Sequence, residues 1–187
     1  MKRAVVIDLD GTLVRCNSFS LYVRQMMWHC PMMMVYAAMR KLRLISHARA
    51  KQLIMAVNVT DTMVDAFVDV LQTYVRAELL KHDADEVVVL ATAAPNMYAE
   101  ILAQRLGIKY CVASNVGAPE NKGEEKCESV KALLKRENLE LYRVITDHVD
   151  DYPLLRENVN GCNVLINPSE KTVSSLKRNN IKFSSQF

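Results

Sequence analysis

The chain has 187 residues, of which 50% are hydrophobic and 24% charged, a composition that indicates a folded globular protein and excludes a disordered one. The net charge of +3 is too small to indicate nucleic-acid binding. The longest uncharged apolar stretch, residues 25–39, contains Pro31 and is short for a bilayer span, so we expect no transmembrane segment. The five cysteines show no C-x-x-C spacing, and a strand pattern begins at the N-terminus. We therefore expect reduced thiols, no signal peptide and a cytoplasmic protein.

Strand and helix patterns alternate along most of the chain. Apolar runs predict strands at residues 3–8, 86–91, 109–113, 142–147 and 162–166, and helical patterns cover residues 95–106, 124–137 and 151–158. This alternation predicts an α/β fold in which helices cover both faces of a doubly wound parallel sheet. The polar tail after residue 168 is expected to hold a short helix before it frays.

Residues 14–81 interrupt this alternation. They contain helical patterns and no strand–turn–strand signal, so we expect a small all-helical domain inserted after the first strand. The predicted boundaries are residues 1–13 and 82–187 for the core and residues 14–81 for the insertion. Thr60 or Asp61 is expected to cap the last helix of the insertion.

The segment 5–12, VVIDLDGT, is the most informative part of the sequence. Its three β-branched residues predict a buried strand, and Gly11 allows the backbone to turn at the end of that strand. Asp8 and Asp10 would then lie at the strand tip, where α/β sheets bind ligands. A cation such as Mg²⁺ would relieve the repulsion between the two carboxylates. The alternative is an ordinary acidic turn, because Asp and Gly are common turn residues.

Further polar motifs follow the later strands. The second predicted strand ends at Thr92, a segment with two lysines (121–126, NKGEEK) precedes a helix, and the strand ending near residue 146 leads into the segment 147–151, DHVDD. The chain thus carries an acid pair, a hydroxyl, a lysine and a second acid pair, in this order. This order resembles that of the motifs in the haloacid dehalogenase-like (HAD) phosphatase superfamily. The segments 91–95 (ATAAP) and 123–126 (GEEK) are most similar to its phosphoserine-phosphatase-like branch. The core resemblance covers about two-thirds of the chain.

The resemblance implies a Rossmann-like core with a helical cap, here residues 14–81, that closes over a phosphate site. It implies a phosphatase that hydrolyses a small-molecule phosphomonoester through an aspartyl-phosphate. Asp8 would attack phosphorus, and Asp10 would protonate the leaving alcohol and then activate water. A carboxylate at Asp10 argues for phosphate chemistry, since the dehalogenases of this superfamily lack an acid there. Mg²⁺ would be held by Asp8, the main-chain carbonyl of Asp10 and Asp147.

The phosphate-binding groups also follow from the resemblance. The Thr92 hydroxyl and the Ala93 N–H would donate to phosphate oxygens. The alternative for Thr92, taken without the other motifs, is an ordinary β-branched strand terminus. The lysine of the family corresponds to Lys122 or Lys126. We favour Lys126, because Gly-Glu-x-Lys is the commoner pattern in this branch. The alternative for Lys126 is a solvated lysine on a helix surface.

The last motif contains the second acid pair of the family. Asp151 lies four residues after Asp147 and matches the acid that orients a metal-bound water or the lysine. Asp150 is the alternative to Asp151 and could instead cap the following helix. The family usually has Gly before the first acid, where this chain has Thr146. We expect His148 to be solvated or to lie beside the metal site rather than to bind the metal.

The cap segment is basic and rich in methionine. Residues 12–60 contain seven Lys or Arg and no acidic residue, and six of the ten methionines lie within residues 26–39, beside Trp28 and Tyr36. We favour a methionine-filled cap core with a cationic solvated face. The alternatives are a lid over an anionic, partly apolar substrate and peripheral contact with an anionic membrane surface.

Asn17 bears on the substrate. Phosphoserine phosphatases carry an acidic residue nine positions after the nucleophile, where it recognises the substrate amine, and this chain has Asn17 there. We therefore expect that phosphoserine is not the main substrate. The alternatives to a phosphatase are a phosphotransferase or phosphomutase on the same scaffold, and a non-catalytic protein that binds anions or lipid surfaces. The sequence indicates no oligomeric state.

Overall fold

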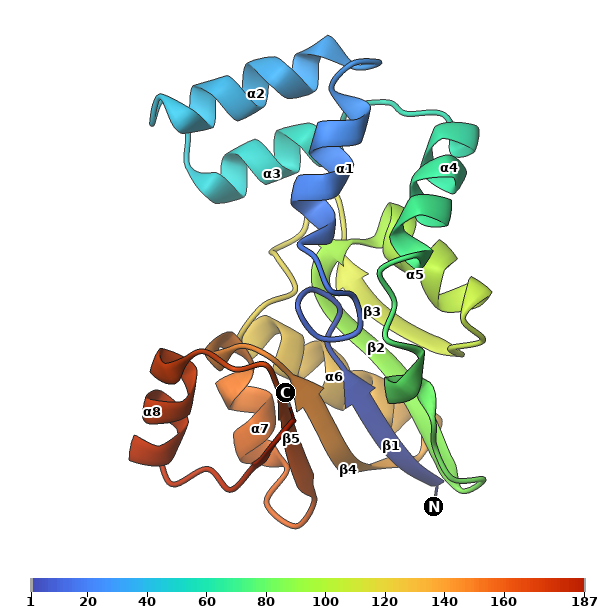
Figure 1. The fold of residues 1–187 in the computed structure, drawn as a ribbon, viewed down its shortest axis with the longest axis vertical. Helices are drawn as coiled ribbons and strands as arrows, with labels where there is room; N and C mark the ends of the chain where they lie inside the picture. The colour runs from blue at the N-terminus through green and yellow to red at the C-terminus, as the bar shows by residue number, and fades with distance from the viewer. Residues whose placement is uncertain (1, 187) are drawn as a thin grey trace.

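The structure is a computed structural model that describes residues 2–186 (Figure 1). Its six strands form one parallel sheet in the order β3-β2-β1-β4-β5-β6. The strands are β1 (Lys2–Ile7), β2 (Glu86–Pro95), β3 (Tyr110–Ser114), β4 (Leu139–Thr146), β5 (Cys162–Ile166) and β6 (Ser184–Gln186). Because β1 lies in the middle of the order, its C-terminal end is at the centre of one edge of the sheet.

The helices of the described residues fall between these strands. They are α1 (Ser18–Met26), α2 (Pro31–Lys41), α3 (His47–Met55), α4 (Asp61–Gln72), α5 (Asn96–Arg105), α6 (Glu124–Glu137), α7 (Tyr152–Glu157) and α8 (Glu170–Arg178), with short 3₁₀ turns η1 (Ala77–Leu80) and η2 (Val149–Asp151). The chain thus alternates between strand and helix everywhere except between β1 and β2, where α1–α4 follow one another.

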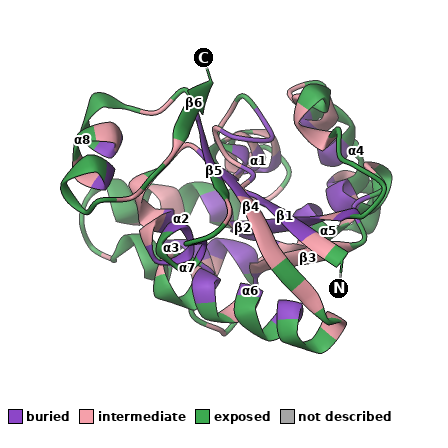
Figure 2. Ribbon diagram, turned by 90° about the horizontal axis from the view of Figure 1, so that it is seen from below, coloured by how far each residue is buried: buried purple, intermediate pink, exposed green. Residues whose placement is uncertain are grey.

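Both faces of the sheet are covered, as the continuous apolar strands predict. Successive β1 residues enter different apolar clusters: Val5 and Ile7 pack with α1, α4 and α5, and Ala4 and Val6 pack with α6, α7 and α8. The C-terminal parts of β1 and β4 are accordingly buried, whereas the first part of β4 is intermediate or exposed (Figure 2). The predicted α/β fold with a doubly wound parallel sheet is confirmed.

Helices α1–α3 lie together beyond the C-terminal ends of the strands, whereas α4 returns toward the sheet and runs beside α5 (Figure 1). Three aromatic side chains join these elements. The Tyr22 ring of α1 lies 5.2 Å from that of Phe67 in α4, and the Phe67 ring lies 5.0 Å from that of Tyr98 in α5. Both pairs have the edge-to-face arrangement that stabilises aromatic contacts. This aromatic cluster fixes the base of the inserted helices against the core.

Methionine side chains fill only part of the space between the inserted helices. Met26 and Met33 are buried, but Met32 and Met34 are exposed. The favoured interpretation, a methionine-filled cap core, therefore accounts for some of these residues and leaves the exposed pair unexplained. No helix within residues 2–186 has the length and apolar character needed to cross a membrane.

The element boundaries differ from the prediction in the polar segments. Strand β4 begins at Leu139 instead of residue 142, because Asn138 ends α6 in the left-handed conformation (φ 53°) and the chain enters the sheet directly. Pro95 ends β2 and precedes α5, although we expected it in the first helical turn. The tail holds α8 as predicted, but it does not simply fray, since β6 pairs with β5. Strand β6 has only exposed polar side chains, so no apolar pattern indicated it.

Candidate active site

The loop after β1 brings two carboxylates to the centre of the sheet edge. The Asp8 N–H donates to the Ile145 carbonyl of β4 at 2.9 Å, so Asp8 still belongs to the strand ladder. The chain then folds back, with the Leu13 N–H donating to the Asp8 carbonyl at 3.1 Å and Gly11 at φ +76°. The tight loop, rather than strand alternation, turns Asp8 and Asp10 toward the same cavity.

This cavity has a volume of about 560 Å³ and lies between the sheet edge and the inserted helices. Its lining includes all the side chains predicted from the strand ends and from the start of α6: Asp8, Asp10, Thr92, Ala93, Lys122, Lys126, Asp147, Asp150 and Asp151. The inserted segment contributes Arg15, Cys16, Asn17, Phe19, Ser20, His47 and Lys51. Segments distant in the sequence therefore meet in one site, which we call the β1-tip cavity.

Lys126 lies between two carboxylates in the floor of the β1-tip cavity. Its Nζ is 2.6 Å from Asp8 Oδ1 and 2.8 Å from Asp151 Oδ1, and its side chain is 4% exposed. Burial alone would lower the pKa of Lys126, but the adjacent Asp151 and Asp8 carboxylates raise it, so the lysine remains charged. Lys122 is half-exposed and pairs with Asp150 at the rim, at 2.7 Å. The structure thus separates the two candidate lysines, with Lys126 in contact with Asp8.

Thr146 supports the same cluster. Its hydroxyl donates to Asp151 Oδ2 at 2.6 Å, and both side chains are buried. The family usually has Gly at this position, and here the extra hydroxyl provides a hydrogen bond to the second acid. Because Asp151 accepts from both Lys126 and Thr146, its carboxylate is held in one orientation. His148 is exposed and contacts Asp150 at the rim.

Asp10 is held by the first turn of α1. The Ser18 N–H donates to Asp10 Oδ1 at 2.8 Å, and the Ser18 hydroxyl is hydrogen-bonded to the fully buried Tyr98 hydroxyl at 2.9 Å. Burial raises the pKa of Asp10, although the hydrogen bonds from Ser18 lower it in part. A raised pKa favours the protonated form of the carboxyl group, which is the form that a general acid requires. Sequence reasoning missed Ser18 and Tyr98, because neither carries a motif.

Asp147 approaches the β1 loop at Gly11. A Cβ on Gly11 would overlap the Asp147 carboxylate, so only glycine lets β4 bring this side chain so close to the loop. Burial raises the pKa of Asp147, as it does that of Asp8. The two carboxylates, at the ends of adjacent strands, are therefore both costly to ionise, and Lys126 offsets part of this cost for Asp8.

We expect Gly11→Ala to lower activity by at least about tenfold, because the new Cβ must displace Asp147 and a shift of about 1 Å can cost far more. Positive φ also adds about 1–2 kcal/mol of strain for alanine. Gly107→Ala is the matched control, since Gly107 has φ +71° but nothing within 4 Å of an added Cβ. Steady-state kinetics and melting curves of both variants separate the two effects. Equal activity in the two variants would show that displacement of Asp147 does not matter.

Thr92 lies in the C-terminal part of β2, three residues before the strand ends, and is buried there, where its Oγ1 accepts from the Ala94 N–H at 3.0 Å. Its hydroxyl hydrogen remains available for a ligand oxygen in the cavity. The Asn121 amide donates to the Thr92 carbonyl at 2.9 Å and to the Val112 carbonyl at 3.1 Å, which ties the ends of β2 and β3 together. Asn121 was quoted in the motif before α6 but received no role from the sequence.

Comparison with known proteins agrees with this geometry. Residues 5–156 match the profile of the haloacid dehalogenase-like hydrolases. The chain belongs to this family. No curated protein matches its sequence. The resemblance inferred from the motifs is therefore confirmed at the level of the family.

Solved structures show the same fold at low sequence identity. A protein with unknown function from Bordetella pertussis Tohama I is 14% identical, with a TM-score of 0.77 and 100% of each chain covered. A phosphoserine phosphohydrolase-like protein from Francisella tularensis subsp. tularensis SCHU S4 is 15% identical, with a TM-score of 0.61, and the match covers 98% of this chain and 94% of that one. A phosphoserine phosphatase in its apo form is 14% identical, with a TM-score of 0.67 and coverages of 100% and 94%. At these identities the likeness concerns the fold alone.

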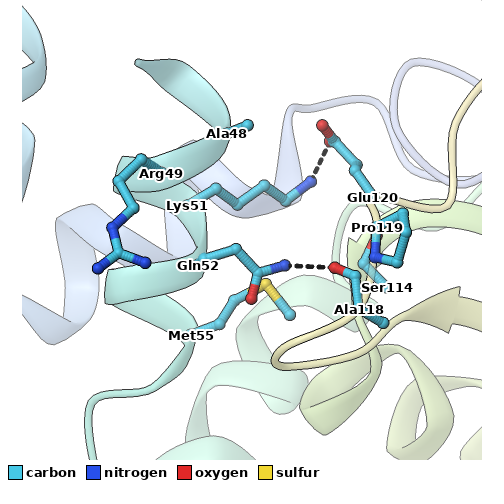
Figure 3. Close-up of a pocket in the computed structure, with 9 residues that line it drawn as sticks. All are labelled: Ala48, Arg49, Lys51, Gln52, Met55, Ser114, Ala118, Pro119 and Glu120. Carbon is cyan, nitrogen blue, oxygen red and sulfur yellow. Dashed lines mark hydrogen bonds and ion pairs between the residues drawn. The ribbon is translucent and has the colours of Figure 1, made fainter. Parts of the chain in front are cut away.

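In this HAD-like hydrolase, helix α3 is anchored to the loop after β3 (Figure 3). Lys51 reaches from α3 to the Glu120 carboxylate and donates to the Ala93 carbonyl at 2.7 Å. Gln52 donates to the Ala118 carbonyl at 2.8 Å and accepts from the Gly117 N–H at 2.9 Å. These contacts border a second cavity of about 260 Å³ and hold the inserted helices over the β1-tip cavity.

Lys51 and Glu120 are site residues that sequence reasoning did not identify. Lys51 was counted only among the basic residues of the inserted segment, yet it is 7% exposed and lines the β1-tip cavity. Its helical spacing could have indicated burial, because Lys51 lies on the same face of α3 as Ala50, Ile54 and Met55. These four are the buried residues of α3. A lysine on such a stripe must find a partner, and here it pairs with Glu120.

Proposed function

We propose that this HAD-like hydrolase is a Mg²⁺-dependent phosphatase that hydrolyses a small-molecule phosphomonoester through an aspartyl-phosphate on Asp8. The observation that carries the proposal is the buried Lys126, which lies 2.6 Å from Asp8 in a cavity shared with Asp10, Thr92 and Asp147. A fixed cation, a nucleophilic carboxylate and a protonatable carboxyl are the groups that phosphoryl transfer requires. We also propose that residues 14–81 act as the cap and that the enzyme works in the cytoplasm.

In the proposed reaction, an Asp8 oxygen attacks phosphorus while the alcohol leaves. Asp10 gives its proton to the departing oxygen and then takes a proton from the water that hydrolyses the acyl phosphate. Lys126 and the Thr92 hydroxyl contribute positive charge and a hydrogen bond to the phosphoryl oxygens as negative charge builds up on them. Ser18, backed by Tyr98, keeps Asp10 oriented throughout.

The donors around Asp8 fit a magnesium ion. Asp8 and Asp147 offer hard carboxylate oxygens. Burial raises the pKa of both groups, and a bound cation would offset the cost of ionising them. Among residues 2–186, no three His, Cys, Asp or Glu side chains form a metal cluster, and the proposed set needs only these two carboxylates and the Asp10 carbonyl. When bound, the ion would neutralise charge on the transferring phosphoryl group.

We expect Mg²⁺ affinity to fall as the pH falls below about 7. Burial raises the pKa of Asp8 to about 7, partly opposed by Lys126, so protons compete with the ion for this carboxylate below that pH. The pKa of Asp8 is higher in the folded than in the unfolded protein, so protonation of Asp8 favours the folded state. Without metal, the free energy of unfolding therefore falls as the pH rises through 7 and Asp8 becomes charged. The increase in melting temperature caused by Mg²⁺ should therefore be larger at about pH 8 than at about pH 5.5. Equal shifts at both pH values would contradict this coupling.

A panel of phosphomonoesters tests the proposed function directly. It contains an aryl phosphate, sugar and lipid phosphates and phosphoserine, each measured with Mg²⁺ and with EDTA. We expect metal-dependent release of phosphate from at least one compound. If no compound is hydrolysed, the proposal of phosphatase activity fails.

We expect phosphoserine to rank below other members of this panel. Asn17 stands where phosphoserine phosphatases carry an acid, and its Oδ1 accepts the Ser20 N–H at 2.8 Å as the cap of α1. The substrate amine would therefore meet a neutral side chain already engaged by the backbone. Asn17→Asp keeps the capping oxygen and adds the negative charge, so it should raise phosphoserine turnover relative to the aryl phosphate. Preference of the native protein for phosphoserine would refute this prediction.

A further inference from the structure

The exposed apolar side chains of this protein gather on one part of the cap. Of the nine large hydrophobic side chains exposed within residues 2–186, six belong to α2 and its flanking turns. They are Trp28, Met32, Met34, Val35, Leu42 and Leu44, and we call them the α2 surface. Their exposed fractions range from 43% for Met34 to 76% for Trp28. Single exposed apolar residues need no explanation, but a group of this size indicates an interaction site.

The α2 surface is not a poorly filled part of the cap core. Helix α2 already packs inward through Met33, which is fully buried, and through Tyr36. Val35 and the C-cap residue Leu42, two and nine residues after Met33, lie on the opposite side of the helix. Met32 and Met34 are exposed between the two sides. Helix α2 therefore has a second apolar face that no part of the described chain covers. Figure 1 shows α2 at the end of the molecule remote from the sheet.

The charged residues of the segment that carries the α2 surface are all basic. Arg24, Arg40, Lys41 and Arg43 are exposed next to it, and residues 12–60 contain no Asp or Glu. Within that stretch of the described chain, ion pairs form only at Arg15 and Lys51. The charges around α2 are thus available to an external anion. Apolar side chains surrounded by such cations match the interface of an anionic bilayer, where acyl chains lie below negative headgroups.

We propose that the α2 surface docks this protein on anionic lipid membranes. A symmetric contact with a second copy is disfavoured, because it would place Arg40, Lys41 and Arg43 against their own counterparts. The position is also suited to a surface-bound enzyme. A hollow of about 630 Å³ is bordered by Arg40, Lys41 and residues 43–47, and His47 also lines the β1-tip cavity. The hollow beside the α2 surface is therefore adjacent to the β1-tip cavity through His47. The proposal does not rest on the proposed phosphatase activity.

The single tryptophan gives a direct readout, because Trp28 lies within the α2 surface. The full-length protein is mixed with vesicles of phosphatidylcholine alone, or of equal parts phosphatidylcholine and phosphatidylglycerol, and the emission spectrum and co-sedimentation are recorded. We expect a blue shift and sedimentation only with the anionic vesicles, both weakened by added salt. An unchanged spectrum, or equal binding to both vesicle types, would overturn the proposal. A blue shift that grows with protein concentration without vesicles would instead assign the surface to a second copy.

Paired variants identify the residues responsible. Arg40→Glu with Lys41→Glu, and separately Met32→Ser with Val35→Ser, should each weaken binding to anionic vesicles by at least about tenfold. All four side chains are exposed, so the melting temperature should change little. The matched controls are Lys177→Glu with Arg178→Glu on α8, and Val159→Ser, which alter exposed residues of the core domain. If the controls weaken binding as much as the α2 variants, general charge or hydrophobicity rather than the α2 surface is responsible, and the proposal fails.

Discussion

Replacing Asp8 with asparagine is expected to reduce phosphatase turnover by roughly 10³-fold or more, because the proposed covalent intermediate forms on the Asp8 carboxylate. Asp8 directly follows the central strand β1 and contacts Lys126 at 2.6 Å in the β1-tip cavity. Asparagine keeps the shape of the side chain and removes a charge that burial disfavours. Lys126 also retains Asp151 as its partner. The variant should therefore fold, and the loss should be chemical.

The measurement is phosphate release by native, Asp8→Asn and Asp150→Asn proteins on the best substrate of the panel, together with melting curves. Asp150 is the matched control, since it belongs to the same cavity but lies at the rim and pairs with Lys122. We expect Asp150→Asn to change turnover by less than about tenfold, as is usual for partly exposed ion pairs. Substantial activity in Asp8→Asn would exclude Asp8 as the nucleophile, whatever the behaviour of Asp150→Asn.

The positions of the acidic residues could be predicted because the fold converts sequence order into location. Parallel strands point in one direction, so residues that follow each apolar run meet at one edge of the sheet. Asp8, Thr92 and Asp147 follow three such runs, and the sheet order places β1 between β2 and β4. A strong local pattern and a simple topological rule were therefore sufficient for these residues.

The residues that the inserted helices contribute to the β1-tip cavity could not be predicted in the same way. Lys51 enters the cavity because α3 packs across the loop after β3, and nothing in the local sequence sets that packing. Ser18 and Tyr98 meet for a similar reason, since they come from α1 and α5. Strand β6 was missed because its polar residues contribute only edge hydrogen bonds. These features depend on tertiary contacts between segments that carry no distinctive motif.

The choice between the two lysines has a physical basis in helix periodicity. The buried residues of α6 are Lys126, Cys127, Val130, Leu133 and Leu134. Lys126 thus lies on the stripe that faces the sheet, whereas Lys122 precedes the helix and remains in solvent. The sequence already contained this signal, and it agrees with the motif-based preference for Lys126. The burial of a lysine on an otherwise apolar stripe requires carboxylate partners, which Asp8 and Asp151 provide.

We expect Lys126→Ala to reduce turnover by about 10²–10³-fold, as the loss of a preorganised charge at the reacting phosphoryl group should. The same change leaves Asp8 and Asp151 buried without their cation. Removing one partner of such a pair typically costs about 3–5 kcal/mol, so the melting temperature should fall markedly. At low pH the destabilisation should diminish, because protonated carboxyl groups no longer need a counter-charge.

Lys122→Ala is the matched control for both effects. Lys122 forms a half-exposed pair with Asp150, so its removal should cost less than about 1 kcal/mol and should change turnover only slightly. Kinetics and thermal unfolding of the two variants, measured on the same substrate and over the same pH range, separate a role in the site from a general effect of lost positive charge. Near-normal turnover in Lys126→Ala, combined with a large loss in Lys122→Ala, would transfer the phosphate-binding role to Lys122. Because Lys126 is the lysine that contacts Asp8, we expect the opposite order.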